Sequence, residues 1–108
     1  AAPGAVVVLM TAPSPETARA LAEELVAANL AACVNLIPGA TSIYRWEGRV
    51  EESAEVLLIA KTTRERYPQL AALVAGRHVY DVPEILALPV IDGHGPYLDW
   101  LAGAVSRE

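Results

Sequence analysis

Apolar residues along the chain fall into short runs and helical stripes that predict alternating strands and helices. Residues 5–10 (AVVVLM) form a wholly apolar run, which is typical of a central β-strand. A helix start follows, because Ser14 offers a hydroxyl cap, Pro15 suits the first turn, and Glu16 places a carboxylate near the positive end of the helix dipole. Apolar residues then recur at helical spacing through about Asn29.

The next stretch predicts a β-hairpin with unusually long arms. Its first run covers residues 33–46, its second reaches Lys61, and the two are joined at residues 47–49, where Gly48 suits a tight turn. The Pro38-Gly39 pair indicates a bend or bulge within the first run. Typical strands have about 5–6 residues, so the rest of a small domain cannot cover the far end of this ribbon. Because that end carries Ile43, Tyr44 and Trp46, we expect another copy of the chain to cover it.

The C-terminal half completes a β-α-β-β-α-β order with one further helix. Thr62 and Glu65 fit a capping box at the start of the second helix, and Gly76 fits its end. Residues 84–90 predict a short strand and residues 97–106 a last helix. Right-handed crossovers make this order the ferredoxin-like split βαβ sandwich, an α+β fold with two helices on one face of an antiparallel sheet. In that topology the third strand lies between the first and the second, and the fourth lies beyond the first.

Composition narrows the class of protein. The 108 residues predict one domain spanning 1–108. The net charge of −5, with scattered basic residues, argues against nucleic acid or an anionic membrane as the main partner. No apolar run approaches the roughly 20 residues of a membrane span. The start lacks a basic n-region and a cleavage site, and the single cysteine, Cys33, suits a reducing compartment, so we expect a cytoplasmic protein.

Five segments, read in order, closely resemble the CutA divalent-cation tolerance family: residues 31–39, 41–48, 56–62, 82–90 and 97–101. The resemblance implies a ferredoxin-like fold in a tight homotrimer, in which the long hairpin completes sheets between subunits. It also implies a role in tolerance of copper and other divalent cations, with no established catalytic reaction.

The resemblance directs attention to a metal site around His78. Copper-binding relatives carry a histidine here, a second histidine beside it and a cysteine at the end of the first strand. In this chain Arg77 replaces the second histidine, and Met10 stands where the cysteine would be. Methionine is a soft ligand for Cu(I), so we expect His78 and Met10 to bind copper or another divalent cation, weakened by the missing thiolate. In the alternative interpretation His78 makes a hydrogen bond at a subunit interface and Met10 fills the core.

A cleft between subunits is the second candidate site. Glu84 needs a partner at the start of a buried strand, and Lys61 or an arginine of a neighbouring subunit would supply one. Ligand pockets tend to occur at interfaces, so aromatic residues either line this cleft beside Lys61, His78 and Glu84 or pack the interface. They are Tyr44, Trp46, Tyr80, Tyr97 and Trp100.

Other reactive side chains receive plainer interpretations. Cys33 has no basic residue or histidine near it in sequence, so we expect a buried, inert thiol. The hairpin carboxylates are expected to form a solvated face, with weak binding of Ca²⁺ or Mg²⁺ between neighbours as the alternative: Glu47, Glu51, Glu52 and Glu55.

Two functional alternatives stay open beside the metal-handling trimer. One is a regulatory trimer like the PII signal proteins, binding a small anion in its clefts, which rests on analogy alone. The other is a ligand-free scaffold for partner proteins. We do not expect an enzyme, because no Ser-His-Asp or Cys-His arrangement is evident. The loop after the first strand also lacks the arginine that acylphosphatases of this fold need.

Overall fold

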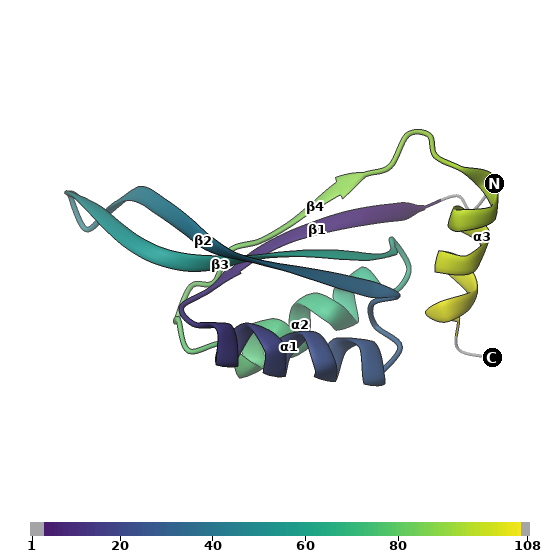
Figure 1. The fold of residues 1–108 in the computed structure, drawn as a ribbon, viewed down its shortest axis with the longest axis horizontal. Coiled ribbons are helices and arrows are strands. Elements are labelled where there is room, and N and C mark those ends of the chain that lie inside the picture. The colour runs from purple at the N-terminus through teal and green to yellow at the C-terminus, as the bar shows by residue number, and fades with distance from the viewer. Residues whose placement is uncertain (1–3, 107–108) are drawn as a thin grey trace.

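In the computed structural model, which describes residues 4–106, four strands form one antiparallel sheet in the order β2-β3-β1-β4 (Figure 1). This is the predicted α+β split βαβ arrangement, with β3 between β1 and β2. The elements are β1 (Ala5–Ala12), α1 (Pro15–Ala27), β2 (Cys33–Trp46), β3 (Arg49–Thr63), α2 (Tyr67–Arg77), β4 (Ile85–Pro89) and α3 (Gly95–Ala104).

The hydrophobic core lies between the sheet and the two helices α1 and α2, which cover one face of it (Figure 1). Alternate residues of β1 and β3 enter this core, where Met10 and Leu58 are fully buried against helix residues such as Leu25 and Leu70. Burying a side chain of this size contributes roughly 1.5–3 kcal/mol. The third helix, α3, lies beyond the end of the sheet, contacts β3 and β1, and contains the buried Leu101.

Local chemistry explains where α1 begins, whereas tertiary pairing explains where α2 begins. The Ser14 hydroxyl accepts a 3.1 Å hydrogen bond from the backbone N–H of Thr17, as predicted. The capping box at Thr62 was a wrong prediction, because β3 continues to Thr63, which pairs with Ala5 of β1. α2 therefore begins only at Tyr67. It also includes Gly76 in its last turn, so that glycine does not end the helix as predicted.

The hairpin turns at Glu47 and Gly48, whose φ angles of 50° and 80° are both positive. A type I′ turn requires this, and it is the turn that matches the twist of two-residue hairpins. The predicted bulge is confirmed between Ile37 and Ala40. There β2 advances three residues (37 to 40) while β3 advances two (57 to 55), so β2 carries one extra residue.

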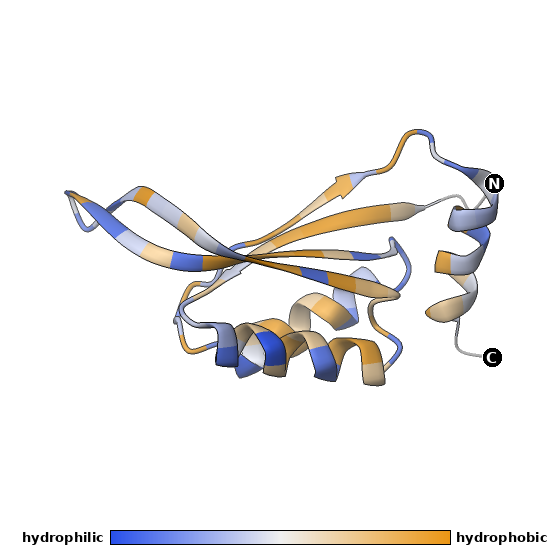
Figure 2. Ribbon diagram, viewed as in Figure 1, coloured by the Kyte–Doolittle hydropathy of each residue, from blue (hydrophilic) through white to orange (hydrophobic). Residues whose placement is uncertain are grey.

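Beyond the bulge the ribbon leaves the body of the domain. β3 pairs with β1 only from Val56 inward, so its outer half is paired with β2 alone (Figure 1). The molecule measures 44 × 25 × 22 Å as a result. Apolar side chains remain exposed on the ribbon and on the sheet face away from α1 and α2, including Ile43, Val50, Leu86 and Leu88. Figure 2 shows hydrophobic positions along the outer ribbon and β4. Between residues 4 and 106 no helix combines the length and the apolar character needed to cross a membrane.

Candidate functional site

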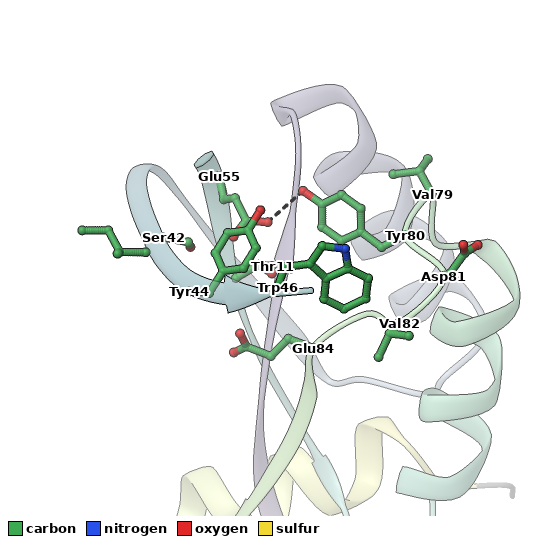
Figure 3. A pocket seen from close by; sticks show the side chains of 11 residues that line it. Thr11, Ser42, Tyr44, Trp46, Glu55, Val79, Tyr80, Asp81, Val82 and Glu84 are labelled. Atoms are coloured by element: carbon green, nitrogen blue, oxygen red, sulfur yellow. Dashed lines mark hydrogen bonds between the residues drawn. The ribbon is translucent and has the colours of Figure 1, made fainter. Parts of the chain in front are cut away.

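A pocket of about 660 Å³ opens between the outer half of the ribbon and the segment 78–84, which connects α2 to β4 (Figure 3). Its lining is aromatic and acidic, with three carboxylates and no lysine, arginine or histidine. The lining residues are Thr11, Ser42, Ile43, Tyr44, Trp46, Glu55, Val79, Tyr80, Asp81, Val82 and Glu84.

Strand alternation brings the ribbon's contribution onto one face. Tyr44 pairs with Glu51 and Trp46 with Arg49, while Ala40 pairs with Glu55. Because side chains two residues apart share a face, both rings lie on the face that Glu55 occupies. The Tyr44 hydroxyl also lies 2.9 Å from the Ser53 hydroxyl, which fixes the end of its ring.

Glu55 is the polar centre of the pocket, and sequence reasoning placed it wrongly in a solvated face. Glu55 is only 8% exposed, and its Oε2 accepts a 2.9 Å hydrogen bond from the Tyr80 hydroxyl. Burial of Tyr80, followed by the hydrogen bond and the negative charge of Glu55, raises the pKa of Tyr80 from 10.0 to about 12. Tyr80 therefore stays a neutral hydrogen-bond donor at physiological pH.

His78 ties this segment to β1. Its Nε2 lies 2.7 Å from the carbonyl oxygen of Thr11, and its Nδ1 lies 3.0 Å from the backbone nitrogen of Tyr80. A carbonyl can only accept and an amide N–H can only donate, so Nε2 carries the proton and Nδ1 accepts. The imidazole also stacks at a tilt on the Tyr80 ring, with centroids 4.8 Å apart. A metal ion at His78 would have to replace one of these two hydrogen bonds.

Met10 and His78 occupy different environments beside β1, which contains Met10. Met10 is fully buried in the core, whereas His78 bonds to the backbone of the next residue, Thr11. In residues 4–106 no cluster of three or more histidine, cysteine, aspartate or glutamate side chains is arranged to hold a metal ion. Within one chain, the predicted copper ligands are one imidazole and one thioether, a sparse donor set. Ligation by these two residues stays a prediction.

The predicted cleft residues are divided between three places. Tyr44, Trp46, Tyr80 and Glu84 line the pocket together. Tyr97 and Trp100 form a separate aromatic pair on α3, with centroids 5.4 Å apart.

Lys61 lies apart from the pocket. It donates a hydrogen bond to Asn35, and its Nζ lies 3.9 Å from the Cys33 sulfur. Cys33 therefore has a basic neighbour that is distant in sequence. In the part of the chain from residue 4 to residue 106, Glu84 forms no ion pair, with Lys61 or any other cation.

Comparisons with known proteins agree with this architecture. Residues 6–104 match the sequence model of a family described as CutA1 divalent ion tolerance protein. The divalent-cation tolerance protein CutA of Thermus thermophilus is 56% identical over 95 residues, which cover 88% of this chain and 92% of the relative. A solved structure of the Thermus thermophilus Cut A1 protein has a TM-score of 0.91 at 53% identity, covering 93% of this chain and 97% of that one. CutA1 from Oryza sativa has a TM-score of 0.95 at 41% identity, covering 99% and 98% of the two chains.

Proposed function

This chain belongs to the CutA1 divalent ion tolerance family, and we propose that it contributes to tolerance of copper and other divalent cations as a cytoplasmic homotrimer. In this proposal the metal binds at or near the subunit interfaces, with His78 as a ligand. The main support for assembly is the ribbon formed by β2 and β3. In its outer half these two strands pair only with each other within the chain.

Exposed apolar surface supports assembly. Ile43 and Val50 near the tip are each 68% exposed, and Leu86 on the open sheet face is 57% exposed. Monomeric soluble proteins rarely leave contiguous apolar patches larger than a few hundred Å² in water. A neighbouring copy that pairs with the outer ribbon would cover these side chains and complete its backbone hydrogen bonding.

The position of His78 supports a role as metal ligand. Metal binding at Nε2 would replace the proton that now points at the Thr11 carbonyl, while Nδ1 kept the amide hydrogen of Tyr80. Met10 precedes Thr11 on β1 and would add a soft sulfur only if the core opened towards the ion. We therefore expect modest affinity and a preference for Cu(I) over Cu(II).

An anaerobic competition titration with Cu(I) and Cu(II) tests this proposal. The tag-free protein is compared with His78→Ala and with His94→Ala, a matched control at the chain's only other histidine, which is exposed before α3. We expect stoichiometric binding by the wild type and by His94→Ala, and its loss in His78→Ala. Equal affinity in the wild type and His78→Ala would exclude this site. Absence of competitive binding by the wild type would mean that the chain keeps the family architecture without a copper site.

A regulatory trimer that binds a small anion is the alternative function. The pocket lining weighs against it within one chain, because it carries Glu55, Asp81 and Glu84 and no cationic side chain. Thermal shifts across a nucleotide and metabolite panel would test this alternative, and a ligand-free scaffold would give no shift at all.

A further inference from the structure

We propose that the pocket between the ribbon and segment 78–84 binds a small organic cation, an alkylammonium group on an apolar body, with Glu55 as its counter-ion. This pocket adjoins the proposed copper site, because Thr11 and Tyr80 line it and both contact His78. It differs from that site in using Glu55 rather than His78 and Met10, and it calls for a different kind of ligand.

The first support is a nearly buried carboxylate that lacks a cation. Glu55 is 8% exposed, and its hydrogen-bond partner is the neutral hydroxyl of Tyr80. Among residues 4–106 no lysine, arginine or histidine forms an ion pair with it. Burying an ionised carboxylate without a partner of opposite charge is costly. A cation that entered the pocket would lower that cost, and Asp81 and Glu84 would add to the attraction.

The second support is the set of rings that line the pocket. Tyr44, Trp46 and Tyr80 all contribute to it (Figure 3). Tyr80 contacts Glu55 directly, and Tyr44 and Trp46 continue the same face of the ribbon outwards from Glu55. Aromatic faces attract cations, and the attraction grows when water is excluded. Two of the rings are held in place by their hydroxyls, Tyr44 at Ser53 and Tyr80 at Glu55. The rings therefore need little reordering when a ligand binds.

The same lining distinguishes an organic cation from a metal ion. Ca²⁺ and Mg²⁺ take several converging oxygen ligands, and residues 4–106 offer no cluster of three or more carboxylates or other ligating side chains so arranged. Val79 and Val82 join the rings in offering apolar contact instead. A volume of about 660 Å³ also falls within the range of small-molecule pockets, about 300–1,000 Å³.

The test uses phenethylammonium as the probe and 2-phenylethanol as its neutral counterpart, in the presence of a metal chelator. Trp46 fluorescence reports binding in a Trp100→Phe background, since Trp100 lies on α3 outside the pocket. Glu55→Gln removes the charge and keeps an acceptor for the Tyr80 hydroxyl. Glu52→Gln is the matched control, because Glu52 lies on the opposite face of the ribbon from Glu55 and does not line the pocket.

We expect saturable binding of phenethylammonium to the wild type and to Glu52→Gln, and binding at least about tenfold weaker to Glu55→Gln, as loss of a charged partner predicts. Glu84→Gln, at an exposed position, provides a second variant should Glu55→Gln fold poorly. Equal affinity for the neutral alcohol, or no saturation by the amine, would overturn the proposal. Val50→Lys places a charge at the exposed tip of the ribbon and is expected to dissociate the assembly. If phenethylammonium bound only to this dissociated variant, the proposal would also be overturned. A basic side chain of a second copy would then occupy the pocket in the assembled protein. The chelator makes each outcome independent of the copper titration.

Discussion

The hydroxyl of Tyr80 donates a 2.9 Å hydrogen bond to the carboxylate of Glu55, joining the segment after α2 to β3 at the base of the ribbon. The backbone N–H of the same tyrosine donates to His78, whose other ring nitrogen donates to Thr11 of β1. One polar chain thus connects two strands and the pocket wall. A substitution at any one of these residues should therefore weaken the hydrogen bonds of the others.

The titration of Tyr80 is the first prediction. Its pKa is raised from 10.0 to about 12 in the folded protein, so its stabilising effect is complete below pH 10 and is lost as the pH rises through about 12. Tyrosinate absorbance should show a step near pH 12 that Tyr80→Phe removes. Glu55→Gln should shift this step downwards but not abolish the shift, because burial of the phenol remains. If the wild type and Tyr80→Phe titrate alike in that range, the hydrogen bond to Glu55 does not persist in solution.

Substitutions at Met10 separate packing from metal chemistry. Met10 is fully buried, so Met10→Ala should lower the free energy of unfolding by about 2–5 kcal/mol. Met10→Leu preserves volume and should cost less than about 1.5 kcal/mol while removing the sulfur. Urea denaturation at a fixed protein concentration measures both. A loss of Cu(I) preference in the stable Met10→Leu variant would identify the thioether as a ligand, and an unchanged preference would restrict Met10 to the core.

The hairpin turn offers a stabilising change. Glu47 adopts a φ of 50°, which costs a side chain such as glutamate more than it costs asparagine. Glu47→Asn creates the Asn-Gly pair favoured in type I′ turns and should raise the free energy of unfolding by roughly 0.5 kcal/mol. Gly48→Ala should lower it by about 1 kcal/mol or more. Nothing lies within 4 Å of the added methyl group, so the cost is one of backbone conformation. Thermal unfolding of the two variants should move in opposite directions.

Assembly depends on the ribbon in our proposal. Val50 is 68% exposed at the tip, and Val50→Lys would place an ammonium in the surface that a second copy is expected to cover. Val26→Lys is the matched control, because Val26 is 43% exposed on α1, away from the ribbon. Light scattering during gel filtration should give the mass of three chains for the wild type and the control, and a smaller mass for Val50→Lys. A wild type with the mass of one chain would contradict the homotrimer.

Much of the fold could be predicted because it depends on local chemistry. The Ser14 cap, the glycine of the turn and the Pro38-Gly39 bulge each act within a few residues, and handedness rules gave the strand order. The start of α2 could not be predicted in this way. Thr62 fits a capping box by sequence, but its partner in β1, Val6, holds it in the sheet. Long-range pairing overrides a local capping signal there.

The pocket was only partly predictable for the same reason. Tyr44, Trp46, Tyr80 and Glu84 were expected in a cleft, but Glu55 was expected in solvent. Glu55 is hydrogen-bonded to Tyr80, 25 residues further along the chain, and no local sequence pattern indicates that contact. Lys61 was expected near Glu84 in a cleft between subunits, which stays a prediction, and within one chain the register places Lys61 level with Val7 of β1. Glu84 instead precedes Ile85, which is level with Met10.

The bulge in β2 has a consequence for where the ribbon is aimed. Near the core, β2 and β3 pair in a register that places Leu36 opposite Leu58. Near the two-residue turn, they pair in a register that places Trp46 opposite Arg49, and the two registers differ by one residue. A chain with one residue fewer between Ile37 and Ala40 would satisfy both registers with an unbroken ladder. The extra residue is therefore not needed for pairing, and its physical effect is to bend and twist the strand. Without it the arm would be as long and as well paired, but would point elsewhere, with its two rings no longer held over Tyr80.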